Sequence, residues 1–125
     1  MDRGVRVSEN GFSAPLLRVS RERVGEIEVL SAAGEIDITS AAQLREALDE
    51  VTATGSTVVI DLSEIEFIGS VGLTTLLVAS NAAPPGRVRV VASTQVRRPV
   101  EVTGLSDVLA LFDTLEAALA AGAAP

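Results

Sequence analysis

Residues 60–73 have the sequence IDLSEIEFIGSVGL, in which an apolar strand gives way to a helix. The strand occupies residues 57–60 and breaks at a short acidic loop, and the leucines that follow Ser70 recur at helical spacing. No charged residue occurs anywhere in residues 68–86. The sequence therefore predicts a hydroxyl on the first turn of an uncharged helix, at the end of a buried strand.

Composition places this stretch in a single domain. The chain has 125 residues, enough for one core built from Val, Leu, Ile and Ala. Its net charge of −7 argues against general affinity for nucleic acid or anionic membrane. The chain begins without an apolar signal segment, and its longest uncharged run is too short and polar to span a bilayer. We therefore expect a soluble cytoplasmic protein.

Missing residue types exclude most catalytic chemistry. The absence of cysteine and histidine removes thiolate nucleophiles, Ser-His catalysis and the usual zinc ligands, and neither lysine nor a glycine-rich phosphate loop is present. Ile68 occupies the position where a nucleophile elbow has glycine, so Ser70 does not fit that motif. We interpret the nearby carboxylates as solvated loop acids: Glu35, Asp37, Asp61, Glu64 and Glu66. We expect a binding protein that is not an enzyme and needs no metal or cofactor.

Ser70 is better explained as a group that is acted upon. The backbone N–H groups and the dipole of a helix start favour an anion, so a phosphate on Ser70 need not unfold the domain. Phosphorylation would still add about 1.5 to 2 negative charges at pH 7. On local grounds alone, a serine that merely caps the helix explains the pattern as well as a regulated site does.

Periodicity along the rest of the chain predicts the element order β β α β α β α β α. We expect a flexible arm over residues 1–11, one domain over 12–121 and a frayed end over 122–125. The expected strands cover residues 16–21, 26–33, 56–62, 87–92 and 108–112, and the expected helices cover 41–51, 71–82, 95–102 and a segment ending at 120. Strands that alternate with helices predict an α/β fold with one mostly parallel sheet of about four to five strands and about four helices, the first hairpin being antiparallel.

Several helix starts carry capping signals. Ser40 and Gln43 are spaced as a capping box, and residues 113–116 are predicted to form a second one. Either Ser93 or Thr94 is expected to cap the helix over residues 95–102.

The helix that follows Ser70 has an unusual outward face. Its inward positions are predicted to be Leu73, Leu76, Leu77 and Ser80. Its outward arc is predicted to be Val71, Thr74, Thr75 and Val78, none of which is charged. A helix that faces solvent usually carries charges, so we interpret this arc as a docking face for a partner. The alternative is that another part of the same domain covers it.

Three segments in register resemble the STAS domain family. Gly34-Glu35-Ile36-Asp37 followed by Ser40-Ala41 resembles the start of these domains. Asp61-Leu62-Ser63 followed by Phe67-Ile68-Gly69-Ser70-Val71-Gly72-Leu73 resembles their central signature, and the segment from Gln95 to Leu105 resembles a later motif. The resemblance covers about residues 15 to 120 and implies the STAS fold. Free-standing members of this size resemble bacterial anti-sigma-factor antagonists, also called anti-anti-sigma factors.

The resemblance implies a partner-switching mechanism in transcription regulation. Ser70 would be phosphorylated by an anti-sigma factor that is itself a serine kinase, and a serine phosphatase would restore the unmodified form. The unmodified antagonist would bind the anti-sigma factor and release its sigma factor. The residues expected at the partner surface are Asp37, Ser40, Ile68, Gly69, Val71, Gly72, Thr74, Thr75 and Val78. No direct contact with nucleic acid or membrane is expected, and a weak homodimer is left open.

Two alternatives keep the same fold. One is a phosphorylation-independent scaffold in a larger regulatory assembly, which Gly69 favours because the signature has Asp at that position. The other is a domain that binds a small molecule or nucleotide at the sheet edge near Asp37 and Ser70.

Overall fold

One long central strand, β5 (Thr57–Ile68), organises the structure, which is a computed structural model describing residues 5–7 and 13–121. β5 pairs in parallel with a neighbour on each side. Its apolar residues face both ways, because Val58, Ile60 and Leu62 belong to one buried cluster while Val59 belongs to another. Burial on both faces explains the continuous apolar run, as the sequence predicted.

The described residues form two β-sheets, four α-helices and one 3-10 helix. In chain order the elements are β1 (Val5–Val7), β2 (Ser13–Pro15), β3 (Leu17–Val24), β4 (Ile27–Ile36), α1 (Ala41–Thr52), β5, α2 (Ser70–Ala82), β6 (Val88–Ala92), α3 (Thr94–Val102), the 3-10 helix η1 (Leu105–Asp107), β7 (Ala110–Phe112) and α4 (Leu115–Ala120).

The main sheet has five strands in the order β3-β4-β5-β6-β7. β3 and β4 are antiparallel, and every later neighbour is parallel. This confirms the predicted mostly parallel α/β fold. Each expected helix and strand of the domain is present, and none of the described helices is long and apolar enough to cross a membrane.

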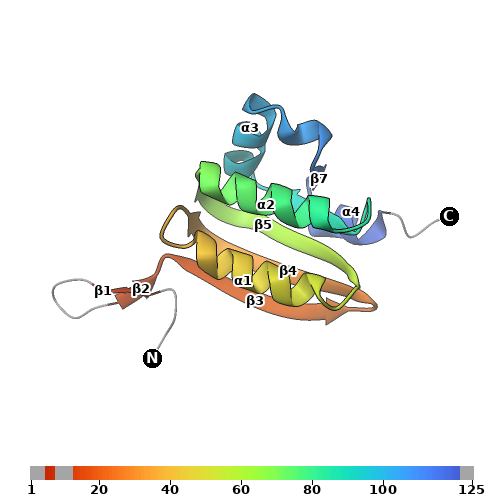
Figure 1. The fold of residues 1–125 in the computed structure, drawn as a ribbon, viewed down its shortest axis with the longest axis horizontal. Coiled ribbons are helices and arrows are strands. Elements are labelled where there is room, and N and C mark those ends of the chain that lie inside the picture. Colours follow the sequence, from red (N-terminus) through yellow and green to blue (C-terminus); the bar gives the residue numbers. More distant parts are fainter. Residues whose placement is uncertain (1–4, 8–12, 122–125) are drawn as a thin grey trace.

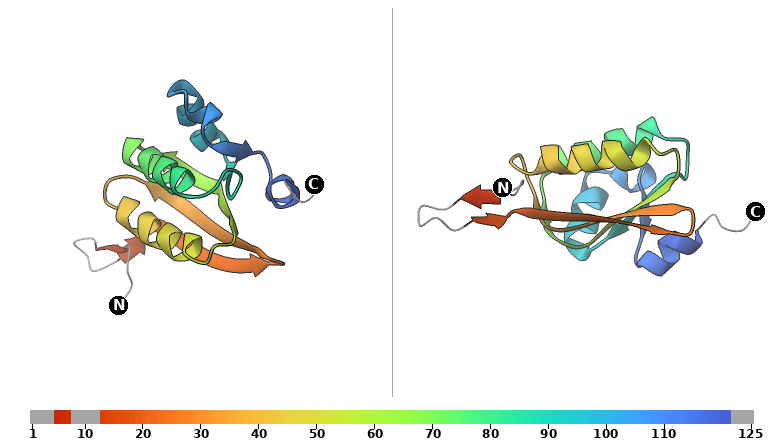
Figure 2. Two further views of the ribbon diagram at one scale, coloured as in Figure 1. Left: turned by 45° about the vertical axis from the view of Figure 1, so that its right-hand side comes forward. Right: turned by 90° about the horizontal axis from the view of Figure 1, so that it is seen from below.

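Two apolar layers enclose this sheet. α1 and α2 lie side by side over one face (Figures 1 and 2) and cover the larger cluster, which includes Leu30, Leu44 and Leu76. α4 covers the smaller cluster on the opposite face, where Ala118 packs with Val59. The end of β5 and the start of α2 are anchored in the larger cluster through Ile68 and Leu73.

β5 does not end at Asp61, so the predicted acidic loop is wrong. The ladder with β4 continues to Ile68 through two irregularities, the first between Ser31 and Ala33 and the second between Gly34 and Glu35. At each one β5 contains an extra residue, which defines a β-bulge. The side-chain carboxylate of Asp61 accepts a hydrogen bond from the backbone N–H of Ser63 at 3.0 Å, within the first bulge.

The N-terminal segment differs from the expected arm in one respect. Residues 5–7 form β1, which pairs with β2 in a separate two-stranded sheet. The remainder of the expected arm and the expected frayed end at 122–125 lie outside the described residues. At the other end of the domain, Pro99 lies inside α3 without ending it.

The predicted capping signals have mixed outcomes. Ser93 caps α3 by accepting a hydrogen bond from the N–H of Val96, which decides between the two residues expected there. α4 starts after Thr114, whose hydroxyl accepts from Ala117 N–H. The cap is therefore one residue later than predicted, and the capping box predicted over residues 113–116 does not form, because the position three residues after Thr114 is alanine. Ser40 precedes α1, yet its side chain makes no capping bond to that helix.

Candidate functional site

Ser70 is the first residue of α2, and its side chain is exposed. Gly69 is the N-cap residue, in an extended conformation with φ −90° and ψ 178°, and it offers no side chain to the helix. The carbonyl oxygen of Gly69 accepts hydrogen bonds from Gly72 N–H at 3.0 Å and Leu73 N–H at 3.1 Å, which closes the first turn. A hydroxyl therefore stands at a helix N-terminus with open solvent around it.

The loop that follows β4 lies beside this turn. Ile36 pairs with Ile68, and the N–H of Gly69 donates to the carbonyl oxygen of Ile36 at 2.8 Å. Ile36 immediately precedes Asp37. The ends of two neighbouring parallel strands thus bring Asp37 and Ser70 to the same edge of the sheet, as the sequence predicted for these residues.

The buried side chain of Ser40 forms hydrogen bonds with two backbone groups beside the Asp37 loop. Its hydroxyl donates to the carbonyl oxygen of Glu35 at 2.8 Å and accepts from the backbone N–H of Asp37 at 3.0 Å. Asp37 Oδ1 accepts from both the N–H of Thr39 at 2.8 Å and its hydroxyl at 2.7 Å. The predicted capping box is wrong because the Ser40 hydroxyl is engaged here, and the side-chain amide of Gln43 donates to Leu17 O at 3.1 Å instead.

Three of the expected partner-surface residues are interior. Ser40, Ile68 and Gly72 are buried, so they shape the surface from below and do not form it. At Gly72 a Cβ atom would lie 2.6 Å from Ile36 Cγ2 and 2.8 Å from Ile68 Cγ1. Only glycine allows α2 to approach the strand ends this closely.

The outward arc of α2 largely follows the prediction. Val71, Thr74 and Val78 are exposed, while Thr75 is half-buried and donates its hydroxyl to Val71 O at 2.8 Å. The predicted inward positions Leu73 and Leu76 are buried, and Leu77 and Ser80 are half-buried. Within the described residues no other element covers the exposed part of this arc, so the alternative of an internal cover is not supported.

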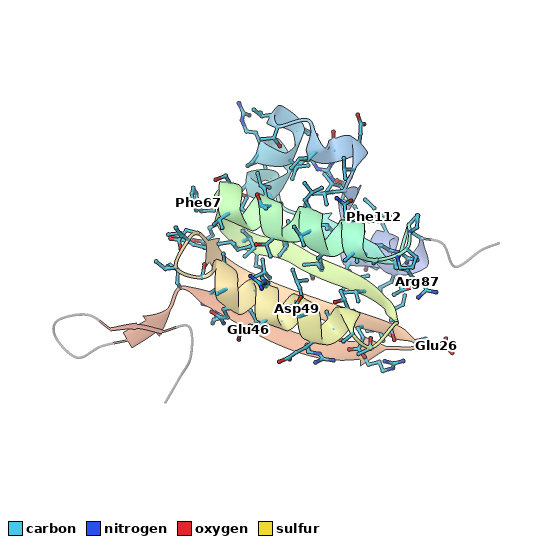
Figure 3. All side chains as sticks on the ribbon, in the orientation of Figure 1. Glu26, Glu46, Asp49, Phe67, Arg87 and Phe112 are labelled. Carbon is cyan, nitrogen blue, oxygen red and sulfur yellow. The ribbon has the colours of Figure 1, made fainter. Side chains whose placement is uncertain are left out.

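Two large exposed apolar side chains, one in the Asp37 loop and one at the end of β5, were not predicted. Ile38 is 81% exposed in the Asp37 loop, and Phe67 is 50% exposed at the end of β5. Figure 3 shows Phe67 near the start of α2, and its ring would lie 3.6 Å from a Cβ placed on Gly69. The only signal in the sequence was an apolar residue in a polar segment. We call the following set the Ser70 surface: Asp37, Ile38, Phe67, Gly69, Ser70, Val71, Thr74 and Val78.

The Ser70 surface contains one acid and no base. Glu35, Glu64 and Glu66 are exposed, as expected for solvated acids, and the described residues contain no cluster of three acids suited to a metal ion. Elsewhere in the described part of the chain, ion pairs are formed by Arg21, Arg23, Glu28, Glu50, Arg97, Glu101 and Asp113. A phosphate on Ser70 would thus receive no countercharge from this surface.

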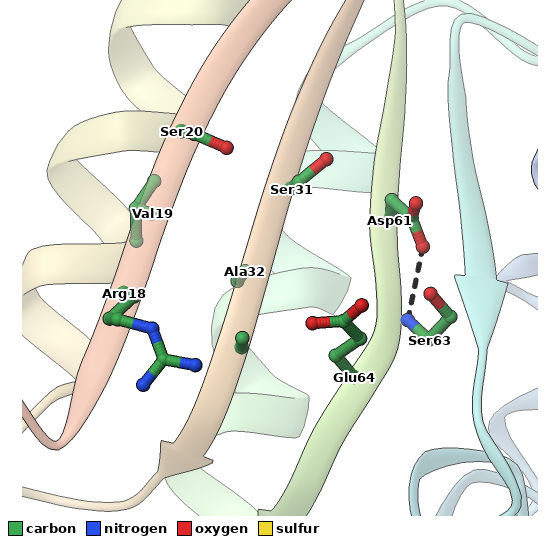
Figure 4. A pocket seen from close by; sticks show the side chains of 9 residues that line it. Arg18, Val19, Ser20, Ser31, Ala32, Asp61, Ser63 and Glu64 are labelled. Atoms are coloured by element: carbon green, nitrogen blue, oxygen red, sulfur yellow. Dashed lines mark hydrogen bonds between the residues drawn. The ribbon is translucent and has the colours of Figure 1, made fainter.

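A shallow hollow of about 370 Å³ lies nearby on β3, β4 and β5. Figure 4 shows Arg18, Ser20, Ser31, Asp61 and Glu64 around it. Neither Asp37 nor Ser70 lines this hollow, and it contains no aromatic residue on which a base could stack. This hollow is therefore distinct from the sheet edge near Asp37 and Ser70 at which a nucleotide site was considered.

The chain is similar to known proteins over most of its length. The STAS domain model matches residues 18–118. Anti-sigma-F factor antagonist RsfB from Mycobacterium tuberculosis is 47% identical over 96 residues, covering 74% of this chain and 79% of that protein. An anti-sigma factor antagonist from Mycobacterium paratuberculosis has a crystal structure with TM-score 0.81 and 38% identity, covering 88% of this chain and 97% of that one.

The protein SpoIIAA shares the fold at lower identity. Its unphosphorylated form has a TM-score of 0.63 and 19% identity, covering 82% of this chain and 94% of that one. The phosphorylated form from Bacillus has a TM-score of 0.58 and 21% identity, covering 82% of this chain and 96% of that one.

Proposed function

The chain belongs to the STAS domain family, and on this premise we propose that it is an anti-sigma-factor antagonist acting in the cytoplasm. It binds an anti-sigma factor through the Ser70 surface and so releases a sigma factor. The anti-sigma factor is a serine kinase that phosphorylates Ser70 and thereby ends the complex. A serine phosphatase restores the binding form.

The observation that carries this proposal is an exposed hydroxyl on a partly apolar surface that contains one acid and no base. Ile38, Phe67 and Val78 expose 81%, 50% and 62% of their surface. Apolar area of this kind gains free energy when a partner covers it. A serine that only accepted a phosphate, without a partner binding at this surface, would not require exposed apolar side chains around it.

A phosphate on Ser70 would act on the complex more than on the fold. Because Ser70 is exposed at a helix N-terminus, the free N–H groups of the first turn stabilise the anion. Within a complex the same charge would be buried without a basic partner on this chain. At a cost of about 3 kcal/mol, affinity would fall by about two orders of magnitude.

Binding measurements with charge variants test the switch. We expect wild type and Ser70→Ala to bind a candidate anti-sigma factor with similar affinity, and Ser70→Glu to bind more weakly by tenfold or more. Ser106→Glu is the matched control, because Ser106 is also exposed but lies in η1. Equal binding by all four proteins would contradict the proposal.

Phosphorylation itself requires a separate experiment. Intact-mass analysis after incubation with the kinase and ATP should show one added phosphate on wild type and none on Ser70→Ala. Modification of the Ser70→Ala variant would place the acceptor elsewhere.

Gly69 favours a second candidate function, a scaffold that is not regulated by phosphate. The residue before Ser70 contributes no carboxylate and no side-chain cap, whereas the family signature has Asp there. Light scattering would separate the two functions, since a scaffold forms a large stable assembly while an antagonist remains small or a weak homodimer.

A further inference from the structure

Arg89 is a buried cation that has no carboxylate partner in the part of the chain that the structure describes. It lies on β6, is 9% exposed and faces the side of the sheet covered by α4. Its Nε donates to Gly86 O at 3.1 Å and its Nη1 donates to Ala118 O at 2.8 Å. In the described part of the chain, no acid lies within ion-pair distance of this guanidinium. Buried charges in proteins are normally paired, so an unpaired one needs an explanation.

A second arginine, Arg87, also has no carboxylate partner among the described residues and lines the same surface hollow as Arg89. Arg87 is exposed, and its Nη1 donates to Gly55 O at 2.7 Å. Both arginines line a hollow of about 430 Å³ together with Arg23, Glu26, Ile27, Gly55, Ser56, Thr57, Leu119 and Ala121. The charge of Arg23 is already balanced by Glu28, and Glu26 is the one acid of the lining.

We propose that this hollow binds a small phosphate-bearing solute, with Arg87 and Arg89 holding the phosphate. Backbone carbonyls fix one nitrogen of Arg87 and two of Arg89, so the remaining N–H groups are pre-oriented. The guanidinium fork matches phosphate oxygens, and Ser56 and Thr57 add hydroxyl donors. The volume suits a small ligand, and the absence of aromatic side chains from the lining disfavours a nucleobase.

The site is separate from the proposed antagonist function. Thr57 begins β5, whereas Ser70 lies two residues beyond its end. β5 covers the same length as the ten residues of β4, which is on the order of 30 Å. A variant in the hollow leaves the Ser70 surface unchanged. Failure of one proposal therefore does not imply failure of the other.

A purely structural role for Arg89 makes a different prediction. Its bond to Ala118 O stabilises the C-terminal turn of α4, as cations near helix ends do. That role explains one hydrogen bond, but it leaves Arg87 and the missing countercharge unexplained. It also predicts no dependence of stability on phosphate.

Thermal unfolding and calorimetry with inorganic pyrophosphate test the proposal. At constant ionic strength, replacing chloride by saturating pyrophosphate should raise the Tm of wild type by about 3 to 8 °C. Arg87→Gln should weaken binding by about 10- to 100-fold, because one charge-assisted contact is lost while the buried arginine remains. Glu26→Gln should strengthen binding, since a repelling charge is removed.

Arg98→Gln serves as the matched control, because Arg98 is exposed on α3 and makes no ion pair within the described residues. Its pyrophosphate affinity should equal that of wild type. Equal Tm values in chloride and pyrophosphate would overturn the proposal. So would an undiminished Tm rise in Arg87→Gln, which would show general anion binding. Inorganic phosphate as a second probe should bind more weakly than pyrophosphate, since it offers fewer oxygens.

Discussion

The N–H of Gly69 donates a 2.8 Å hydrogen bond to the carbonyl oxygen of Ile36, one residue beyond the last pair of the β4–β5 ladder. This bond ties the residue before Ser70 to the residue before Asp37. Two segments separated by about 30 residues of sequence thus become one surface.

Replacing Ser40 by alanine should destabilise the domain. The side chain is buried, and its removal leaves Glu35 O and the N–H of Asp37 without their hydrogen-bond partner. We expect the free energy of unfolding in urea to fall by about 1 to 3 kcal/mol. Ser20→Ala is the control, because Ser20 is exposed and should change stability by less than about 0.5 kcal/mol. Equal stability of the two variants would show that the Ser40 hydroxyl is dispensable.

Ile38 and Phe67 should be the strongest partner contacts after Ser70. Truncating either to alanine removes exposed apolar area, so we expect affinity for the proposed anti-sigma factor to fall by about 5- to 100-fold. Their Tm values should stay close to wild type. Val102→Ala is a matched control, since Val102 is 79% exposed on α3. If Val102→Ala weakened binding as much as Ile38→Ala, the surface would have been assigned wrongly.

Gly72→Ala should be destabilising because there is no room for a methyl group. The new Cβ would lie 2.6 Å from Ile36 Cγ2, so α2 or the strand ends must shift. Overpacking of this kind costs about 1 to 3 kcal/mol. Gly69→Ala is the comparison, because its Cβ would meet no atom closer than 3.6 Å. Denaturant unfolding of both variants should show a larger loss of stability for Gly72→Ala than for Gly69→Ala.

Gly69→Asp should raise stability. An N-cap aspartate accepts a hydrogen bond from the first turn of α2 and interacts favourably with the helix dipole. Because the site has room for a side chain, we expect a gain of about 0.5 to 1 kcal/mol, measured as a higher Tm. Gly69→Ala is the control, because it removes the backbone freedom of glycine in the unfolded chain without adding a capping side chain. A lower Tm for the aspartate than for the alanine would indicate that the cap does not form.

The order of strands and helices could be predicted because each element has a clear period. The run Val58-Val59-Ile60 indicated a strand buried on both faces, and the helix after Ser70 followed from its leucines. The extension of β5 could not be predicted. Its two bulges change the spacing of buried residues to three at Leu62, Ile65 and Ile68, a period that belongs to no regular strand.

The site was only partly predictable for a related reason. Ser70 and Asp37 follow parallel strands, whose ends meet at one edge, so their proximity was expected. Burial of Ser40 and Gly72 depends on contacts with Glu35 and Ile36, which sequence spacing does not reveal. Ile38 was missed because one apolar residue in a loop carries no periodic signal.

The two β-bulges of β5 also set the position of the Ser70 hydroxyl along the strand direction. Ile27 pairs with Thr57 and Ile36 pairs with Ile68, so β5 uses two more residues than β4 over the same length. In a regular ladder those two residues would carry Ser70 about 6 to 7 Å past the Asp37 loop. The acidic stretch therefore works as a spacer. This surplus of two residues over β4, more than their charge, keeps Ser70 at the same position along the strand direction as Asp37.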